Sequence, residues 1–141
     1  MQQQIAAHGL KHVKSEHTGL FLSPTEKTGS IGVQVRHRLT THGLALNITN
    51  EPLPWFNQVV ACGLVDVKAT SISNALAKAG QESQLSMGTE MERMAGLFAN
   101  AFNRDMQPMA DMNVEGISGE IMELEKLAED AGPWPERPKR T

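Results

Sequence analysis

A single thiol is the strongest candidate for covalent chemistry in this sequence. Cys62 is the only cysteine among the 141 residues and stands between a short apolar run and Gly63. A thiolate is a strong nucleophile, and the following glycine lets the backbone approach a ligand and offers its N–H as a donor. Because cysteine is also among the most buried residue types, this context alone favours an inert, packed thiol.

Two other side chains could activate such a thiol. Lys27 precedes a stretch of alternating apolar residues, and an ammonium group beside a thiol favours the thiolate and lowers the thiol pKa. His42 offers a general base instead, as in Cys–His hydrolases. The chain has five histidines, so spacing does not single out His42 among them. A lysine in a turn is normally only a solvated charge, so Lys27 matters only if the fold brings it beside Cys62.

Alternating apolar residues predict the strands that must position these groups. Apolar side chains recur at every second position over 30–36 and again over 44–49, which is typical of two antiparallel strands. The polar stretch 38–43 is expected to connect them, and the product is a half-buried hairpin. Residues 18–22 predict a further short strand that ends at a turn, and 69–70 predict a brief extended piece.

Helical periodicity and capping residues predict four helices. Ser71 or Ser73 can cap one of them and Gly80 can end it. The next carries a stripe of Met, Leu and Phe at helical spacing, which is expected to face the core. Three prolines exclude a regular helix from the last ten residues. The expected helices occupy 1–14, 71–79, 87–103 and 118–130.

Composition excludes several classes of function. A net charge of −3 argues against a nucleic-acid binder, which needs basic side chains for phosphate contacts. One cysteine allows neither an internal disulfide nor a cysteine-based zinc site. No apolar run approaches the roughly 20 residues that span a bilayer. The N-terminal residues show neither a secretory signal nor an Arg-rich transit pattern. We therefore expect no metal, nucleic-acid or membrane partner.

Six short motifs, in matching order and spacing, resemble the octanoyltransferase family of the lipoate–protein ligase B type. Two residues depart from the family pattern: Ala61 stands where proline is usual, and Thr28 stands where an apolar residue is usual. Neither departure removes a chemical group. The motifs are Thr18–Phe21, Lys27–Val33, Thr41–Asn47, Trp55-Phe56, Cys62–Leu64 and Thr70-Ser71.

The resemblance implies acyl transfer through a covalent intermediate. Cys62 would attack the thioester of octanoyl-acyl carrier protein and become an octanoyl thioester. A lysine of a lipoyl domain, in a 2-oxoacid dehydrogenase or the glycine cleavage H protein, would then take the acyl group as an amide. Lys27 would lower the thiol pKa, and no cofactor is implied. The residues implied to line the acyl site are Ser30, Ile31, Gly32, Gly43, Leu44 and Ala45.

The resemblance also implies the fold and the extent of the chain. We expect an α+β fold that resembles the catalytic core of biotin and lipoate ligases, with a mixed sheet and flanking helices. Residues 1–104 would form the C-terminal part of that catalytic domain, and 105–141 an extension with a helix and a Pro-rich tail. The family's upstream Arg-Gly-Gly and Tyr-His-Gly segments have no counterpart here, so the chain is expected to be truncated. Mitochondria are the expected location, or the cytoplasm for a bacterial source.

Three alternatives stay open beside this hypothesis. A non-catalytic fragment would only bind the carrier protein or a lipoyl domain. An ATP-dependent lipoate or biotin ligase would need no cysteine, but its Gly-rich adenylate-binding segment is absent from this sequence. A Cys–His hydrolase would depend on His42 and not on Lys27.

Overall fold

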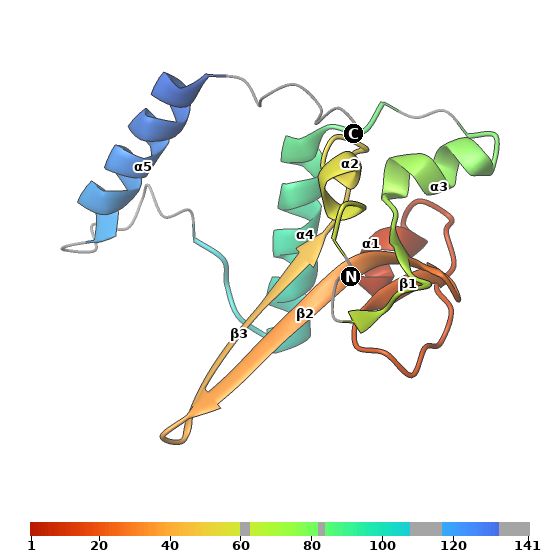
Figure 1. The fold of residues 1–141 in the computed structure, drawn as a ribbon. Helices are drawn as coiled ribbons and strands as arrows, with labels where there is room; N and C mark the ends of the chain where they lie inside the picture. Colours follow the sequence, from red (N-terminus) through yellow and green to blue (C-terminus); the bar gives the residue numbers. More distant parts are fainter. Residues whose placement is uncertain (60–62, 82–83, 108–116, 133–141) are drawn as a thin grey trace. The chain divides into compact units, whose positions relative to one another are not determined.

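The computed structural model of this chain describes residues 1–59, 63–81, 84–107 and 117–132. Helices and a small mixed sheet alternate along these ranges (Figure 1), which confirms the predicted α+β class. The chain divides into two compact units, Met1–Leu97 and Phe98–Thr141. No helix within the described ranges is long and apolar enough to cross a bilayer.

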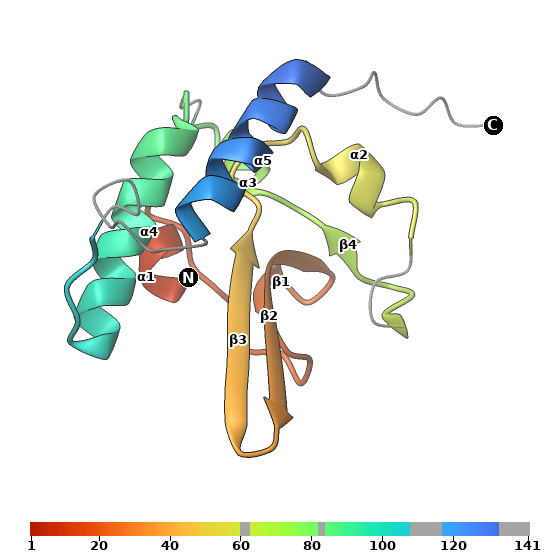
Figure 2. The same ribbon diagram turned by 90° about the vertical axis from the view of Figure 1, so that its left-hand side faces the viewer.

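The sheet is organised around one long strand. β2 (Glu26–Arg36) pairs antiparallel with β1 (Leu20–Ser23) and with β3 (Leu39–Leu46), and parallel with β4 (Lys68–Ala69). The first residues of β2 pair with β1 and β4, and its remainder pairs with β3. Figure 2 shows β2 and β3 side by side along most of their length. One end of β2 is therefore an interior strand, and its other end is an arm of a hairpin.

A two-residue turn sets the register of the hairpin. His37 and Arg38 both have positive φ, at 48° and 66°, as a type I′ turn requires, and this turn matches the natural twist of paired strands. β3 therefore begins at Leu39, and the prediction of a polar connection over 38–43 is wrong. The polarity of that stretch reflects side chains that are exposed on a strand.

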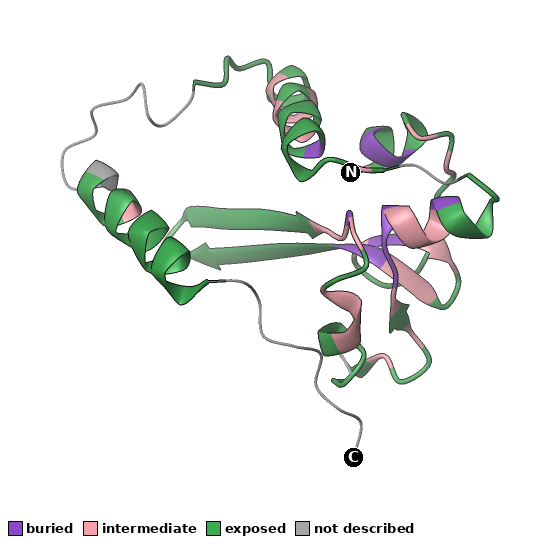
Figure 3. Cartoon of the chain, turned by 90° about the horizontal axis from the view of Figure 1, so that it is seen from above, coloured by how far each residue is buried: buried purple, intermediate pink, exposed green. Residues whose placement is uncertain are grey.

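The hairpin is far more exposed than its alternating pattern predicts. Its apolar side chains are 42% exposed at Leu44, 46% at Ile31, 65% at Val33 and 69% at Val35. Figure 3 shows that the arms of the hairpin are exposed and that burial begins only at the base of β2. Alternation correctly predicts which residues share a face, but the prediction of a half-buried hairpin is wrong.

The core lies where helices meet the base of the sheet. It joins α1 (Gln2–Ala6) and α3 (Ile72–Lys78) to the first strand. α1 is shorter than the predicted helix over 1–14. α3 agrees with prediction, since the Ser71 hydroxyl caps it by accepting the Asn74 N–H at 3.0 Å. The buried apolar cluster is Ile5, Leu20, Ile48, Ile72 and Leu76.

Three more helices complete the described chain. α2 (Leu53–Phe56) is a single turn, whereas α4 (Met87–Phe102) and α5 (Ile117–Ala131) lie close to their predicted ranges. The predicted Pro-rich tail lies outside the described residues. The expected burial of the apolar stripe of α4 is wrong at Met91, which is 67% exposed.

A charged residue, Glu90, is the buried position of α4, with only 4% of its surface exposed. Its carboxylate accepts a hydrogen bond from Gln4 Nε2 and lies 2.9 Å from His8 Nε2 and 3.9 Å from Arg93 Nε. Gln4 Nε2 also donates to the Glu90 carbonyl at 3.2 Å. Because unpaired polar groups are costly in a core, this cluster specifies how α4 docks on α1.

We expect Glu90→Ala to lower the free energy of unfolding by roughly 2 kcal/mol, because the buried Gln4 amide would lose its carboxylate acceptor and keep only the backbone carbonyl of residue 90. Urea unfolding followed by circular dichroism measures the change. Glu92→Ala is the matched control, since Glu92 lies on the same helix and is exposed, and surface substitutions usually cost less than about 0.5 kcal/mol. Equal losses in the two variants would contradict a role for the cluster.

Candidate active site

Lys27 lies inside the sheet, and not in the turn that its polar sequence context suggests. Its backbone is flanked by Phe21 on β1 and Ala69 on β4, which are its Cα partners. The Lys27 carbonyl also accepts the Thr70 N–H at 2.9 Å. The backbone of Lys27 is therefore held from both sides, which fixes the position of the Cα atom from which its side chain extends.

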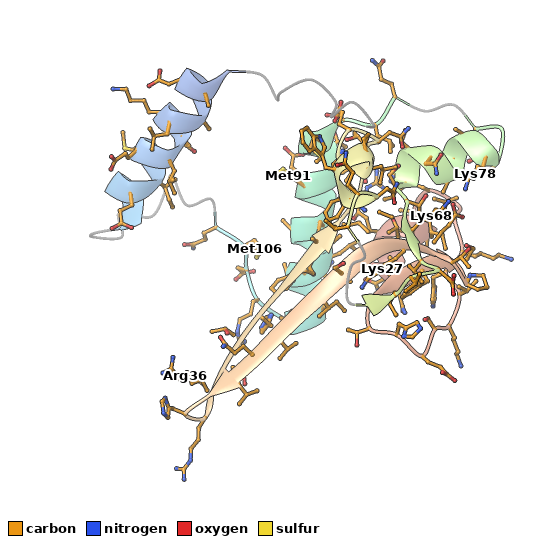
Figure 4. All side chains as sticks on the ribbon, viewed as in Figure 1. Lys27, Arg36, Lys68, Lys78, Met91 and Met106 are labelled. Carbon is orange, nitrogen blue, oxygen red and sulfur yellow. The ribbon has the colours of Figure 1, made fainter. Side chains whose placement is uncertain are left out.

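The Lys27 side chain passes directly over a glycine. A Cβ atom at Gly19 would lie 2.5 Å from Lys27 Cε, 3.1 Å from Lys27 Nζ and 2.6 Å from the Gly29 carbonyl oxygen. Gly19 also has φ +135°, a conformation that residues with side chains rarely adopt. Beyond the glycine, Lys27 Nζ lies 5.8 Å from the centre of the Phe21 ring. Figure 4 marks Lys27 at the base of β2, opposite Arg36 at the hairpin tip.

The charge environment of Lys27 differs from that of the nearby Lys78. Lys78 forms an ion pair with Glu26. Within the described ranges, no ion pair engages Lys27. Its positive charge is therefore available to stabilise a thiolate or another anion brought close to it.

The six residues predicted to line the acyl site lie together on the hairpin. They form the cross-strand pairs Ser30–Ala45, Ile31–Leu44 and Gly32–Gly43. Because side chains alternate between faces, the first and third pairs share one face and the middle pair lies on the other. A Cβ atom at Gly32 or Gly43 would meet nothing within 4 Å. The hairpin therefore offers a smooth, small-residue face and an opposite, apolar face.

The predicted nucleophile, Cys62, lies outside the described residues, but its flanking segments are described. Asn57, which follows α2, accepts the Ala69 N–H on its Oδ1 at 3.1 Å. Ala69 is in turn the cross-strand partner of Lys27. Within this segment Gly63 has φ +71°, a left-handed conformation that favours glycine. The chain that carries Cys62 is thus tied at both ends to the sheet beside Lys27.

The structure separates the two predicted activators of the thiol. His42 pairs with Val33 in the middle of the hairpin, six residues along β2 from Lys27. At about 3.3 Å per residue, this spacing corresponds to about 20 Å. One thiol cannot contact both side chains in this arrangement, so each activator predicts a different site.

Across residues 1–59, 63–81, 84–107 and 117–132, no three His, Cys, Asp or Glu side chains gather closely enough to hold a metal ion.

Comparisons with known proteins find octanoyltransferases among the relatives of this chain. An octanoyltransferase of Thermobifida fusca is 32% identical over 108 residues, which cover 71% of this chain and 45% of the relative. A probable octanoyltransferase of Schizosaccharomyces pombe is 37% identical over 60 residues, or 43% of this chain and 27% of the relative. This chain is related to the octanoyltransferases. It matches no protein-family model.

A further relative is human. It is named a mitochondrial octanoyl-acyl-carrier-protein:protein N-octanoyltransferase and is 43% identical over 60 residues, which cover 43% of this chain and 25% of the relative. The chain thus spans less than half the length of each of these octanoyltransferases.

Sequence reasoning gave no role to several residues that position Lys27. Gly19 and Phe21 belong to a recognised motif, but their contact with Lys27 depends on a positive φ and on the strand register, neither of which the sequence displays. Asn57 and Thr70 act through single hydrogen bonds to the backbone of β4 and β2. Of these last two residues, only Thr70 had a signal in the sequence, because it belongs to the octanoyltransferase-like motif Thr70-Ser71.

We expect Asn57→Ala to loosen the segment that carries Cys62. The Ala69 amide would lose its acceptor, and its hydrogen exchange would become about fivefold faster, since such a bond contributes roughly 1 kcal/mol. Amide exchange followed by NMR measures this rate. Gln58→Ala, which changes the next exposed residue, should leave the Ala69 rate unchanged. Unchanged exchange in Asn57→Ala would show that this bond does not close the segment.

Proposed function

We propose that this chain transfers an octanoyl group from octanoyl-acyl carrier protein to a lysine of lipoyl domains, through a thioester on Cys62. The observation that carries the proposal is the relationship to octanoyltransferases of bacteria, yeast and human. The described geometry of Lys27 supports it. Its backbone pairs with Ala69, the end of the segment that contains the only thiol, and no ion pair within the described ranges engages its ammonium.

The proposed reaction has two steps. In the first, the Cys62 thiolate attacks the thioester carbonyl, the carrier protein leaves as its thiolate, and an octanoyl thioester forms on Cys62. In the second, a neutral lysine amine of the lipoyl domain attacks that thioester, releases the Cys62 thiolate and gives its proton to water to form the amide. The acceptor domains are those of 2-oxoacid dehydrogenases and of the glycine cleavage H protein. No cofactor takes part.

Lys27 supports both steps by electrostatics. A fixed ammonium favours the thiolate before the attack. It also stabilises the negative charge that develops on the carbonyl oxygen of each tetrahedral intermediate, which is commonly the largest single contribution to such catalysis. A lysine held by the sheet on both sides is suited to this role, because it needs little reorganisation when the charge develops.

The small-residue face of the hairpin is the proposed resting place for part of the acyl chain. Gly32 and Gly43 pair across the strands, with open space where their side chains would be. Ser30 and Ala45, the neighbouring pair on that face, are also small. An extended alkyl chain can therefore approach the backbone closely along this line.

The proposed location is the mitochondrion. The human relative carries that location in its name, while relatives from bacteria carry none. For a bacterial source the location would be the cytoplasm.

The assay of choice is octanoyl transfer from octanoyl-acyl carrier protein to a lipoyl domain by the whole 141-residue chain, with the acyl-enzyme detected by mass spectrometry. We expect Cys62→Ser to abolish the thioester intermediate, and Lys27→Ala to slow transfer by roughly 10²- to 10³-fold, as expected for the loss of one charge-stabilising donor. Lys78→Ala is the control, because Lys78 is already neutralised by Glu26.

Each alternative function has its own outcome in this assay. Transfer that persists in Cys62→Ser would sink the thioester mechanism. Loss of acylation in His42→Ala with full activity in Lys27→Ala would favour a Cys–His mechanism. Carrier-protein binding without any acyl-enzyme would leave a non-catalytic binding protein.

A second prediction concerns the acyl chain. Gly32→Val should slow octanoyl transfer while leaving stability unchanged, because a valine side chain there enters open space and suits a strand. Its matched control is Gln34→Val, which adds the same side chain two residues along the same face of β2. The rates are measured with octanoyl and with acetyl donors. A loss that is equal for both donors would contradict an acyl-chain site at Gly32.

A further inference from the structure

We infer that Gly19 and Phe21 are positioning residues for the Lys27 ammonium, the charge to which the proposed function assigns the activation of the Cys62 thiol. This inference rests on the proposed function and deepens it, since it explains how that function obtains a fixed charge. Both residues touch Lys27 and not the reacting thioester, so they act through Lys27.

Gly19 provides the passage for the Lys27 stem. The 2.5 Å separation between a Cβ at position 19 and Lys27 Cε is shorter than any normal carbon–carbon contact, and the same Cβ would lie 2.6 Å from the Gly29 carbonyl oxygen. A backbone carbonyl within the sheet cannot move aside cheaply. Even alanine at position 19 must therefore displace the Lys27 side chain, the β1–β2 pairing, or both.

Phe21 provides the surface on which the ammonium rests. Only 1% of Phe21 is exposed, and its carbonyl accepts the Val13 N–H at 2.9 Å. Its ring is thus fixed by packing and by the sheet. Lys27 Nζ lies 5.8 Å from the ring centre, within the range in which the negative face of a ring attracts a cation. A ring does not neutralise the charge as a carboxylate would, so the field of the ammonium remains.

The irregular pairing of β1 explains how these two contacts arise together. The register between β1 and β2 shifts between Leu20 and Phe21, and again between Phe21 and Ser23. Such bulges re-aim single side chains and are over-represented beside active sites. Here Phe21 lies between the two shifts and faces Lys27 as its cross-strand partner.

The test measures the reactivity of Cys62 directly, because it is the only thiol in the chain. The rate of its alkylation by iodoacetamide is recorded against pH for the whole chain, together with kcat and KM for octanoyl transfer. We expect Lys27→Ala to move the alkylation midpoint upward by about 1 pH unit. Gly19→Ala and Phe21→Leu should move it in the same direction and lower kcat by roughly 10- to 100-fold with little change in KM.

Two matched variants separate positioning from stability. Gly9 also has a positive φ, +71°, but a Cβ there meets nothing within 4 Å, so Gly9→Ala carries the backbone strain without the contact to Lys27. It should leave the pH profile unchanged. Phe21→Trp keeps an aromatic face under the ammonium and should retain the original midpoint, whereas Phe21→Leu should not. This pair keeps the inference testable if Gly19→Ala does not fold.

The failure of this inference is distinguishable from that of the proposed function. If Lys27→Ala leaves the alkylation profile unchanged while Cys62→Ser still abolishes transfer, the transfer function stands, but Lys27 does not activate the thiol and this inference is overturned. If Lys27→Ala shifts the profile but Phe21→Leu and folded Gly19→Ala do not, the function stands and the positioning role is overturned. Equal shifts for Phe21→Leu and Phe21→Trp would also overturn it.

Discussion

The pairing of β2 on both sides is the constraint on which the rest of the structure depends. β1 holds the first residues of β2 on one side, and the two-residue strand β4 holds them on the other. So short a parallel ladder is weak alone. Three further bonds support it: Thr70 N–H to the Lys27 carbonyl at 2.9 Å, Asn47 Nδ2 to the Thr70 carbonyl at 3.0 Å, and Ala69 N–H to Asn57 Oδ1 at 3.1 Å. These bonds form a small network that holds β4 against β2, and the backbone of Lys27 is thereby fixed.

A small core gives that network its rigidity. Five apolar residues are buried in the cluster, and a core of this size supplies limited stability. The buried carboxylate of Glu90 specifies geometry more than it adds stability, because its partners are fixed in place: Gln4 on α1 and His8 in the turn that follows α1. The hairpin arm beyond the core keeps its apolar residues exposed. Rigidity is therefore concentrated at the base of β2, where Lys27 lies.

The sequence predicts the elements better than it predicts their surroundings. Period-two alternation placed the two hairpin strands, and Ser71 with Gly80 placed α3, because these signals are local. Alternation reports which side chains share a face and not whether anything covers that face, so the exposure of Val33 and Val35 was not predictable. Glu90 was missed because a charged residue is rarely buried. The strand position of Lys27 was missed because pairing partners distant in sequence, and not its polar neighbours, place it in the sheet.

Two lysines with the same charge show why position matters more than residue type here. Lys78 lies against the Glu26 carboxylate, and the paired charges largely cancel at a distance. Lys27 rests over the Phe21 ring, so its charge is not cancelled. An ammonium group held near a thiol favours the thiolate over the neutral thiol. The chain places a glycine with φ +135° under Lys27, where a side chain would block this position. The backbone conformation at Gly19, just before β1, thereby helps to determine where the charge of Lys27 lies in the candidate site.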